Sequence, residues 1–161
     1  MRLEEEIKQV HFRSPFEKAI LNVRFTNGWL DRILLPVLKQ YGLSEEQFNV
    51  LRILRGQHPT PSSLQLISGR MLNRMSNVTR LVEKLRLNEL VTRNVCPENR
   101  RKVDILITEK GLAVLDEVAP LLQAEMQRHQ HITEDEVAEL NRILDKFRGP
   151  DSDPAADSAD K

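Results

Sequence analysis

Basic side chains are concentrated between Arg70 and Lys102, although the formal net charge of the whole chain is zero. The stretch holds nine arginines and lysines against three glutamates, while acidic residues gather at the two ends of the chain. A local positive potential on a neutral protein is suited to binding nucleic-acid phosphates. On charge alone, a solvated helix face that binds nothing is the other interpretation.

The first half of this stretch combines its charge with side chains that can hydrogen-bond to DNA bases. Apolar residues at helical spacing predict a helix from about Asn73 to Asn88, with a buried stripe of Met75, Val78, Leu81, Val82 and Leu85. The outer face then carries polar groups and no bulky apolar group: Arg74, Ser76, Asn77, Thr79, Arg80 and Lys84. We predict that Asn77 and Arg80 contact base edges. We predict contacts to phosphates or bases for Ser76, Thr79 and Lys84.

The second half predicts a β-hairpin with a charged tip. Two strand-like runs cover residues 91–95 and 103–107, and a two-residue period places Val103, Ile105 and Ile107 on one face. The polar turn between them contains Arg100, Arg101 and Lys102. Such a tip can follow the DNA backbone or insert an arginine, for which we favour Arg101, into the minor groove. A helix-turn-helix followed by a β-wing accounts for this order.

The elements that position these residues are marked by helix caps. Ser14 to Glu17 predicts a capping box that opens a helix reaching Tyr41-Gly42, with a bend or break near Gly28 or Pro36. A second box at Ser44 to Gln47 opens a helix that Gly56 ends, and Thr60-Pro61 is expected to start the next one, which ends near Gly69.

Two further helices follow the predicted hairpin. Thr108 is expected to cap a helix kinked at Pro120, and a third capping box at Thr133 to Glu136 opens a helix that Gly149 ends. The acidic remainder has no apolar stripe and is predicted to be disordered.

The fold class predicted from these elements is mainly α with a small β-wing, a winged helix-turn-helix whose N- and C-terminal helices form a dimerisation region. We expect a helical arm at residues 1–41, the winged domain at 42–111, C-terminal helices at 112–148 and an acidic tail at 149–161. Packing the first and last helices on their equivalents in a second copy would bury their apolar stripes and set two recognition helices one DNA turn apart. A larger monomeric core is the alternative to this homodimer.

Several segments resemble the MarR family of winged-helix regulators. The resemblance covers the segment before the helix-turn-helix, the recognition helix, and the wing with the start of the next helix. These are residues 42–51, residues 76–85, and residues 90–93, 97–101 and 106–111. The resemblance implies a dimeric DNA-binding regulator, with an effector bound between the dimer arms and the winged domain. We therefore expect either a ligand pocket lined by Phe25, Trp29, Ile33 and Tyr41 or a plain core at these residues.

The chain departs from the family pattern at three positions. Asn99 stands where the family usually has an aspartate that pairs with the wing arginine, here Arg101, so the wing is expected to be looser without DNA. Cys96 also replaces a common aspartate. Glu89 replaces the usual glycine after the recognition helix, and we expect Asn88 to take the left-handed conformation there.

Other kinds of site find little support in the sequence. Cys96 is either an oxidant sensor, its thiol pKa lowered by the wing cations, or a surface cysteine without a sensing role, which we favour. His129 and His131 are two positions apart and lack further ligands nearby, so neither a metal nor another cofactor is expected. No catalytic constellation is visible, and we expect no enzyme activity. The chain shows no signal peptide or membrane span, so we expect a cytoplasmic protein without membrane contact.

Together these observations predict a sequence-specific transcriptional regulator. We expect a repressor that binds palindromic double-stranded promoter DNA as a homodimer and is released by a small molecule or another signal. The alternative is a winged-helix interaction module whose basic face docks an acidic protein partner.

Overall fold

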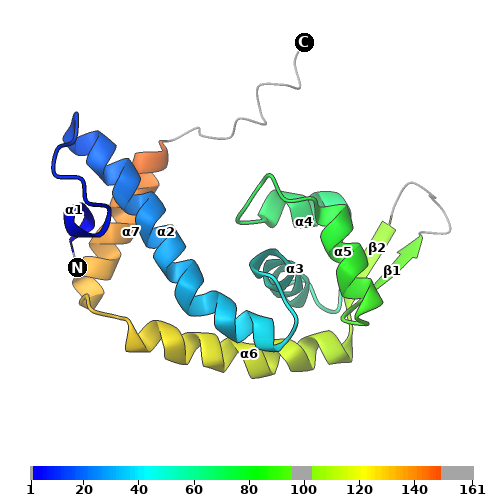
Figure 1. Cartoon of the computed structure of the whole chain (residues 1–161). Helices are drawn as coiled ribbons and strands as arrows, with labels where there is room; N and C mark the ends of the chain where they lie inside the picture. Colours follow the sequence, from blue (N-terminus) through cyan, green and yellow to red (C-terminus); the bar gives the residue numbers. More distant parts are fainter. Residues whose placement is uncertain (1, 96–102, 150–161) are drawn as a thin grey trace, which may run out of the picture. The chain divides into compact units, whose positions relative to one another are not determined.

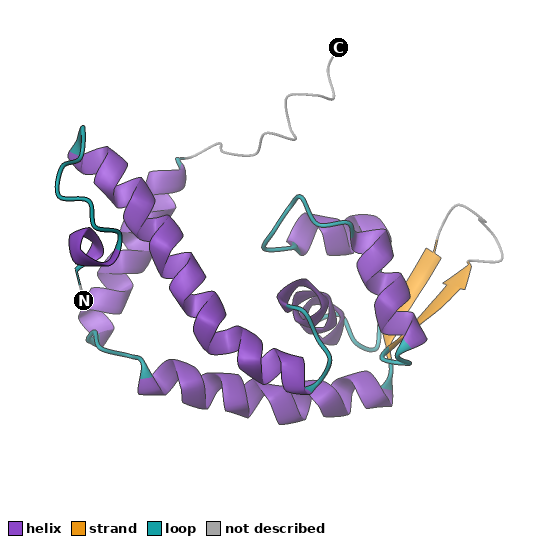
Figure 2. Cartoon of the chain, in the orientation of Figure 1, coloured by secondary structure: helices purple, strands orange, loops and turns teal. Residues whose placement is uncertain are grey.

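The computed structural model describes residues 2–95 and 103–149. Its helices and strands are α1 (Leu3–Glu6), α2 (Pro15–Gln40), α3 (Glu45–Arg55), α4 (Leu64–Arg70), α5 (Val78–Leu87), β1 (Val91–Val95), β2 (Val103–Ile107), α6 (Glu109–Arg128) and α7 (Glu134–Arg148) (Figure 1). The protein is therefore mostly helical with one small sheet, as predicted (Figure 2). None of the described helices is long and apolar enough to cross a membrane.

The chain divides into two compact units, Met1–Met126 and Gln127–Lys161. The first unit contains the helix-turn-helix elements, the sheet and the helices on either side of them in the sequence. The second unit contains α7, whose start is fixed by the predicted capping box: Thr133 accepts a hydrogen bond from the Glu136 N–H, and the Glu136 carboxylate accepts one from the Thr133 N–H. Gly149 ends α7 with a φ of 78°, as a helix-ending glycine permits.

The long helix α2 differs from its prediction in two details. Ser14 caps it by accepting a hydrogen bond from the Glu17 N–H at 3.1 Å, but the Glu17 carboxylate accepts from the Arg13 N–H instead of closing the box on Ser14. The helix also runs without a break through Gly28 and Pro36. Pro36 is exposed, so water can satisfy the carbonyl that its ring leaves without a partner.

The core is built from one side of each helix-turn-helix element and one face of the sheet. The capping box of α3 forms as predicted, with Ser44 and Gln47 each accepting a hydrogen bond from the other's N–H. Fully buried apolar side chains come from α2, α3, α4, α5, β2 and α6, among them Leu38, Leu51, Ile67, Leu85, Ile105 and Leu115. This core holds α5 on the surface, with its polar side outward.

The start of α4 was predicted wrongly. The helix begins at Leu64 with Ser63 as its N-cap, not at Thr60-Pro61. The preceding residue, Ser62, pairs with Ile105 instead, through two backbone hydrogen bonds of 2.9 Å. Extended pairing with the sheet keeps this segment from being helical, and it ties the helix-turn-helix to the wing.

The two strands match their prediction. They pair antiparallel, from Val91 opposite Ile107 to Val95 opposite Val103, and Ile105 and Ile107 point into the core. Thr108 then caps α6, because its Oγ1 accepts a hydrogen bond from the Gly111 N–H at 3.0 Å. The helix continues past Pro120 to Arg128.

The turn after α5 corrects another expectation. Glu89, not Asn88, takes the left-handed conformation, with a φ of 62° against −88° for Asn88. Asn88 is still the C-cap of the helix, so the left-handed position falls one residue later. The Glu89 side chain pairs with Lys110 at 2.9 Å, and this hydrogen bond lowers the pKa of the Glu89 carboxyl.

Candidate DNA-binding surface and adjoining pocket

The recognition helix α5 begins at Val78, five residues later than predicted. Asn77 is its N-cap, since the Asn77 Oδ1 accepts a hydrogen bond from the Arg80 N–H at 3.1 Å. Asn73 Oδ1 accepts in the same way from the Met75 N–H at 3.0 Å. Asparagine side chains that bond to nearby backbone compete with helix formation, which is why residues 73–76 form a turn.

This turn overturns the helical-wheel placement of two side chains. Met75 was predicted to be buried, but 91% of its surface is exposed, so the prediction was wrong. Ser76 was predicted to face outward, whereas its Oγ is buried and has no hydrogen-bond partner among the described residues. Leu72 is also 77% exposed, so bulky apolar groups do lie beside the start of the recognition helix.

Within α5 itself, the predicted polar face is present. Val78, Val82 and Leu85 are buried, while Thr79, Arg80 and Lys84 are exposed. Arg80 and Lys84 lie one helical turn apart on the same side, and Thr79 precedes them at the N-terminal end. Arg74 is exposed on the preceding turn. The partial positive charge of the helix N-terminus adds to the potential of this surface.

Further along α5, one cation of the basic stretch is neutralised. Arg86 makes a two-pronged contact with Glu83, at 3.0 Å from Nε and 2.7 Å from one terminal nitrogen. The hydrogen bond from Arg86 holds the pKa of Glu83 below its usual value. Within the described ranges, the unpaired positive charge of α5 therefore comes from Arg80 and Lys84.

The wing-tip predictions concern residues outside the described part of the chain. These residues are Cys96, Asn99, Arg100, Arg101 and Lys102. Their proposed DNA contacts, the proposed looseness of the wing and the two interpretations of Cys96 stay predictions, as does the disorder of the acidic tail beyond Gly149.

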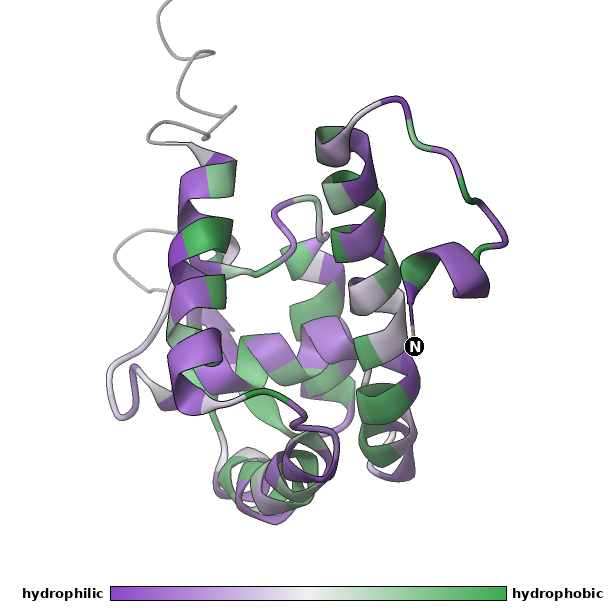
Figure 3. Ribbon diagram, turned by 90° about the vertical axis from the view of Figure 1, so that its left-hand side faces the viewer, coloured by the Kyte–Doolittle hydropathy of each residue, from purple (hydrophilic) through white to green (hydrophobic). Residues whose placement is uncertain are grey.

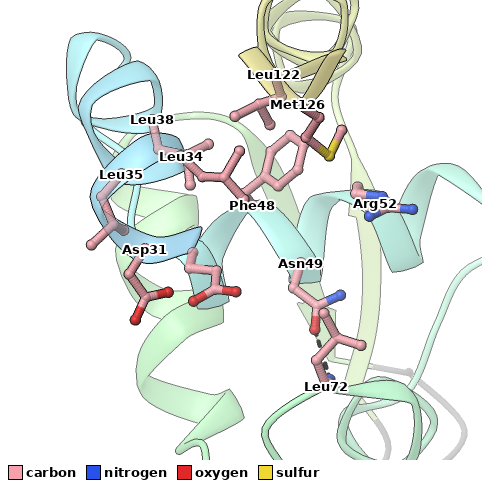
Figure 4. A pocket seen from close by; sticks show the side chains of 11 residues that line it. Asp31, Leu34, Leu35, Leu38, Phe48, Asn49, Arg52, Leu72, Leu122 and Met126 are labelled. Atoms are coloured by element: carbon pink, nitrogen blue, oxygen red, sulfur yellow. Dashed lines mark hydrogen bonds between the residues drawn. The ribbon is translucent and has the colours of Figure 1, made fainter. Parts of the chain in front are cut away.

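A pocket lies beside the helix-turn-helix, within the first compact unit. It has a volume of about 170 Å³ and is lined by side chains of α2, α3 and α6 and by Leu72 (Figure 4). In both α2 and α3 the lining residues follow an i, i+3, i+4, i+7 spacing that starts with an acid: Asp31, Leu34, Leu35 and Leu38, and Glu45, Phe48, Asn49 and Arg52. The remaining lining residues are Leu122 and Met126 of α6.

This pocket is not formed by the four residues proposed from the sequence. Phe25, Trp29 and Ile33 do not line it, and Tyr41 borders a different cavity together with Leu87 and Lys110. The sequence does contain a signal for the lining of this pocket, because an acid followed by the same spacing occurs in two consecutive helices. The assignment of Phe25, Trp29, Ile33 and Tyr41 to a ligand pocket or to a plain core stays a prediction.

Asn49 connects the pocket to the recognition helix. Its side chain lines the pocket, and its Oδ1 accepts a hydrogen bond from the Leu72 N–H at 2.9 Å (Figure 4). Leu72 opens the turn that leads into α5 and itself lines the pocket. Both residues of this hydrogen bond therefore belong to the pocket lining.

Comparison with known proteins identifies transcriptional regulators that are similar in sequence to this chain. The MarR family model matches residues 43–103. The chain is 31% identical over 103 residues to the HTH-type transcriptional regulator MhqR of Bacillus subtilis, an alignment that covers 64% of this chain and 70% of that relative. It is 30% identical over 125 residues to the HTH-type transcriptional repressor IacR of Pseudomonas putida, covering 73% and 74%.

Solved structures share the fold. A MarR transcription factor from Planctomyces limnophilus matches with 32% identity and a TM-score of 0.64, over 84% of this chain and 98% of that one. BpsR of Bordetella bronchiseptica, whose DNA binding is regulated by 6-hydroxynicotinic acid, matches in fold with a TM-score of 0.72 and 22% identity, over 88% and 99%.

Proposed function

Because the chain belongs to the MarR family of transcriptional regulators, which have a winged-helix fold, we propose that it represses transcription by binding palindromic promoter DNA as a homodimer. A small molecule or another signal would release it from the DNA. Its relatives are transcriptional regulators rather than enzymes, and the proposal requires no catalytic residue. A role in repression is supported by the name of the Pseudomonas putida relative. The proposal implies a cytoplasmic protein.

The exposed face of α5 is the observation that carries this proposal. Arginine, lysine and threonine are suited to contact base edges and phosphates in the major groove, and Thr79, Arg80 and Lys84 lie together on an exposed helix that the core holds in place. We assign base contacts first to Arg80. Asn77 already uses its Oδ1 as a cap, so its amide N–H₂ is the part that remains for a base or a phosphate.

Exposed apolar side chains on the outer helices support a homodimer. Both α2 and α7 are amphipathic, with green apolar residues recurring among purple polar ones along the helices in Figure 3. Large apolar side chains remain exposed on each: Phe16, Ile20, Val23 and Leu30 on α2, and Leu140, Ile143 and Phe147 on α7. Large exposed apolar side chains repeated along a helix mark an interaction site, and a two-fold dimer would cover each helix on both copies at once.

The pocket beside the helix-turn-helix is our candidate for the effector site. It is mostly apolar, and the Asn49–Leu72 hydrogen bond joins it to the turn that leads into α5. A ligand that favours one position of this turn would bias the position of the recognition helix and so change the affinity for DNA.

Binding of purified protein to genomic DNA fragments, followed by fluorescence anisotropy at several salt concentrations, tests the proposal. We expect preferred binding to one or a few fragments, with affinity that falls steeply as salt increases. The variant Arg80→Ala should lose about 1–3 kcal/mol of binding free energy on the preferred fragment. Arg24→Ala removes the same charge from the exposed surface of α2 and serves as the control.

Equal affinity for all fragments at moderate salt would argue against a sequence-specific regulator. If, in addition, acidic peptides bound as tightly as DNA and were equally sensitive to Arg80→Ala, the protein-interaction module would be the better explanation.

A further inference from the structure

We infer that the pocket between α2, α3 and α6 binds a small organic monocation, an amine with an apolar body. The inference concerns the charge of the ligand, and only its consequence for DNA binding rests on the proposed function.

The middle of the pocket fits the apolar body of such a ligand. Leu34, Leu38, Phe48, Leu122 and Met126 surround it, and Figure 4 shows these side chains gathered around the Phe48 ring. The cavity of about 170 Å³ is of the size that holds a single aromatic ring, since an engineered apolar cavity of about 150 Å³ binds benzene. Burial of a ring or a branched alkyl group here would contribute affinity without specifying charge.

The charge of the ligand is specified by two carboxylates at one end. Asp31 and Glu45 both line the pocket and stand first in the two helical runs that form it. In the described part of the chain, the ion pairs include neither of them. Partial burial raises the pKa of Glu45, and the negative charges of Asp31 and Glu46 raise it further. A bound ammonium group would offset both the burial and the mutual repulsion.

The cation among the lining residues lies away from the two acids. Arg52 lies at the other end, and Figure 4 shows Asp31 and Arg52 on opposite sides of the Phe48 ring. Arg74 lines an adjoining polar cavity, which Glu45 also borders, and not the apolar pocket. Asp31 accepts a hydrogen bond from the Asn27 amide at 3.4 Å, and an ammonium group would add a charged donor to both acids. A carboxylate ligand that reached Arg52 would bring a third negative charge to the pocket.

Three probes with the same phenylethyl body separate the contribution of charge from that of shape. These are 2-phenylethylamine, the neutral 2-phenylethanol and the anionic 3-phenylpropionate, each titrated into the full-length protein by calorimetry. We expect the amine to bind about tenfold or more tightly than the alcohol, because charge-assisted hydrogen bonds are the stronger ones, and the propionate to bind most weakly.

Variants of Asp31 and Glu45 test whether these two carboxylates cause the preference for the amine. Asp31→Asn and Glu45→Gln should each bring amine affinity down toward that of the alcohol and leave alcohol affinity unchanged. Glu117→Gln removes an exposed acid from α6 outside the pocket and should have no effect. Equal melting temperatures of the variants would show that the losses are not caused by unfolding.

Three results would overturn the inference: tighter binding of the propionate than of the amine, equal affinity for all three probes, or binding of none of them. DNA binding is measured separately by anisotropy with and without 2-phenylethylamine. If the amine binds but the protein shows no DNA binding at all, the proposed function fails while the ligand class stands. If DNA binds normally and the amine does not, the ligand class alone fails.

Discussion

At the scale of single residues, close packing explains why the first turn of α6, directly after the wing, contains a glycine, Gly111. A Cβ at this position would lie 2.3 Å from the Leu90 carbonyl oxygen and 2.8 Å from Ile107 Cγ1. Contacts this short require the neighbouring backbone to move. The glycine in segment 106–111, which resembles the MarR family, thus has a steric explanation here: the turn after α5 packs directly on the first turn of α6.

Replacing this glycine should be costly. We expect Gly111→Ala to destabilise the protein by about 1–3 kcal/mol, as overpacking in a dense core does. The matched control is Gly28→Ala in α2, where the new methyl group meets nothing within 4 Å, and alanine is expected to stabilise the helix by about 0.5–1 kcal/mol. Urea denaturation followed by circular dichroism measures both, and equal effects of the two substitutions would refute the steric argument.

At the scale of elements, the start of α5 depends on Asn77. As the N-cap, Asn77 holds the recognition helix at Val78, and alanine there should cost about 0.5–2 kcal/mol of stability. Asn77→Ser retains a capping oxygen, so stability should be largely kept. The two variants separate capping from base contact: if serine keeps stability but lowers DNA affinity, the amide of Asn77 contacts DNA.

The loop hydrogen bond of Asn49 gives a second prediction about this element. Asn49→Leu removes the acceptor of the Leu72 N–H while retaining an apolar pocket wall, and we expect weaker DNA binding because the turn before α5 is no longer held. Asn49→Asp keeps an acceptor oxygen and is the control. DNA anisotropy combined with amide hydrogen exchange at residues 72–77 measures the effect. Unchanged exchange in Asn49→Leu would mean that this hydrogen bond does not position the turn.

The sequence predicted elements well wherever the signal was local. The capping boxes at Ser44 and Thr133 and both strands lie where expected, because caps and two-residue alternation involve only near neighbours. The start of α4 depended on the distant partner Ile105, which no local pattern reveals. The start of α5 was predicted too early because the apolar spacing extends back to Met75. The side chains of Asn73 and Asn77 bond to the backbone there, so the helix begins only after Asn77.

The candidate site was predictable to a similar extent. Thr79, Arg80 and Lys84 lie on the exposed face expected from a helical wheel, since the wheel applies wherever the helix is formed. Ser76 was misplaced because it precedes the helix. The pocket lining depends on how α2, α3 and α6 pack, and packing between helices far apart in sequence is a tertiary property.

At the scale of the whole molecule, the apolar face of α7 should be an interface between two copies. Ile143→Glu puts a charge among Leu140, Ile143 and Phe147, and we expect it to shift the protein toward monomer in sedimentation analysis. The affinity of this variant for palindromic DNA should also fall, because a monomer binds only one half-site. Asn141→Glu adds the same charge at an exposed polar position of α7 and should remain dimeric. A dimeric Ile143→Glu would place the interface elsewhere.

Selection from a random-sequence pool of duplex DNA tests most directly whether the α5 surface makes this protein a sequence-specific regulator. We predict that the wild-type protein enriches a two-fold symmetric sequence whose half-sites are about one helical turn apart, roughly 10 base pairs. The variant Arg80→Ala should lose enrichment at specific positions in each half-site, while Arg24→Ala should enrich the wild-type sequence. Enrichment of no sequence by the wild-type protein, or of the same sequence by Arg80→Ala with equal strength, would contradict the role assigned to α5.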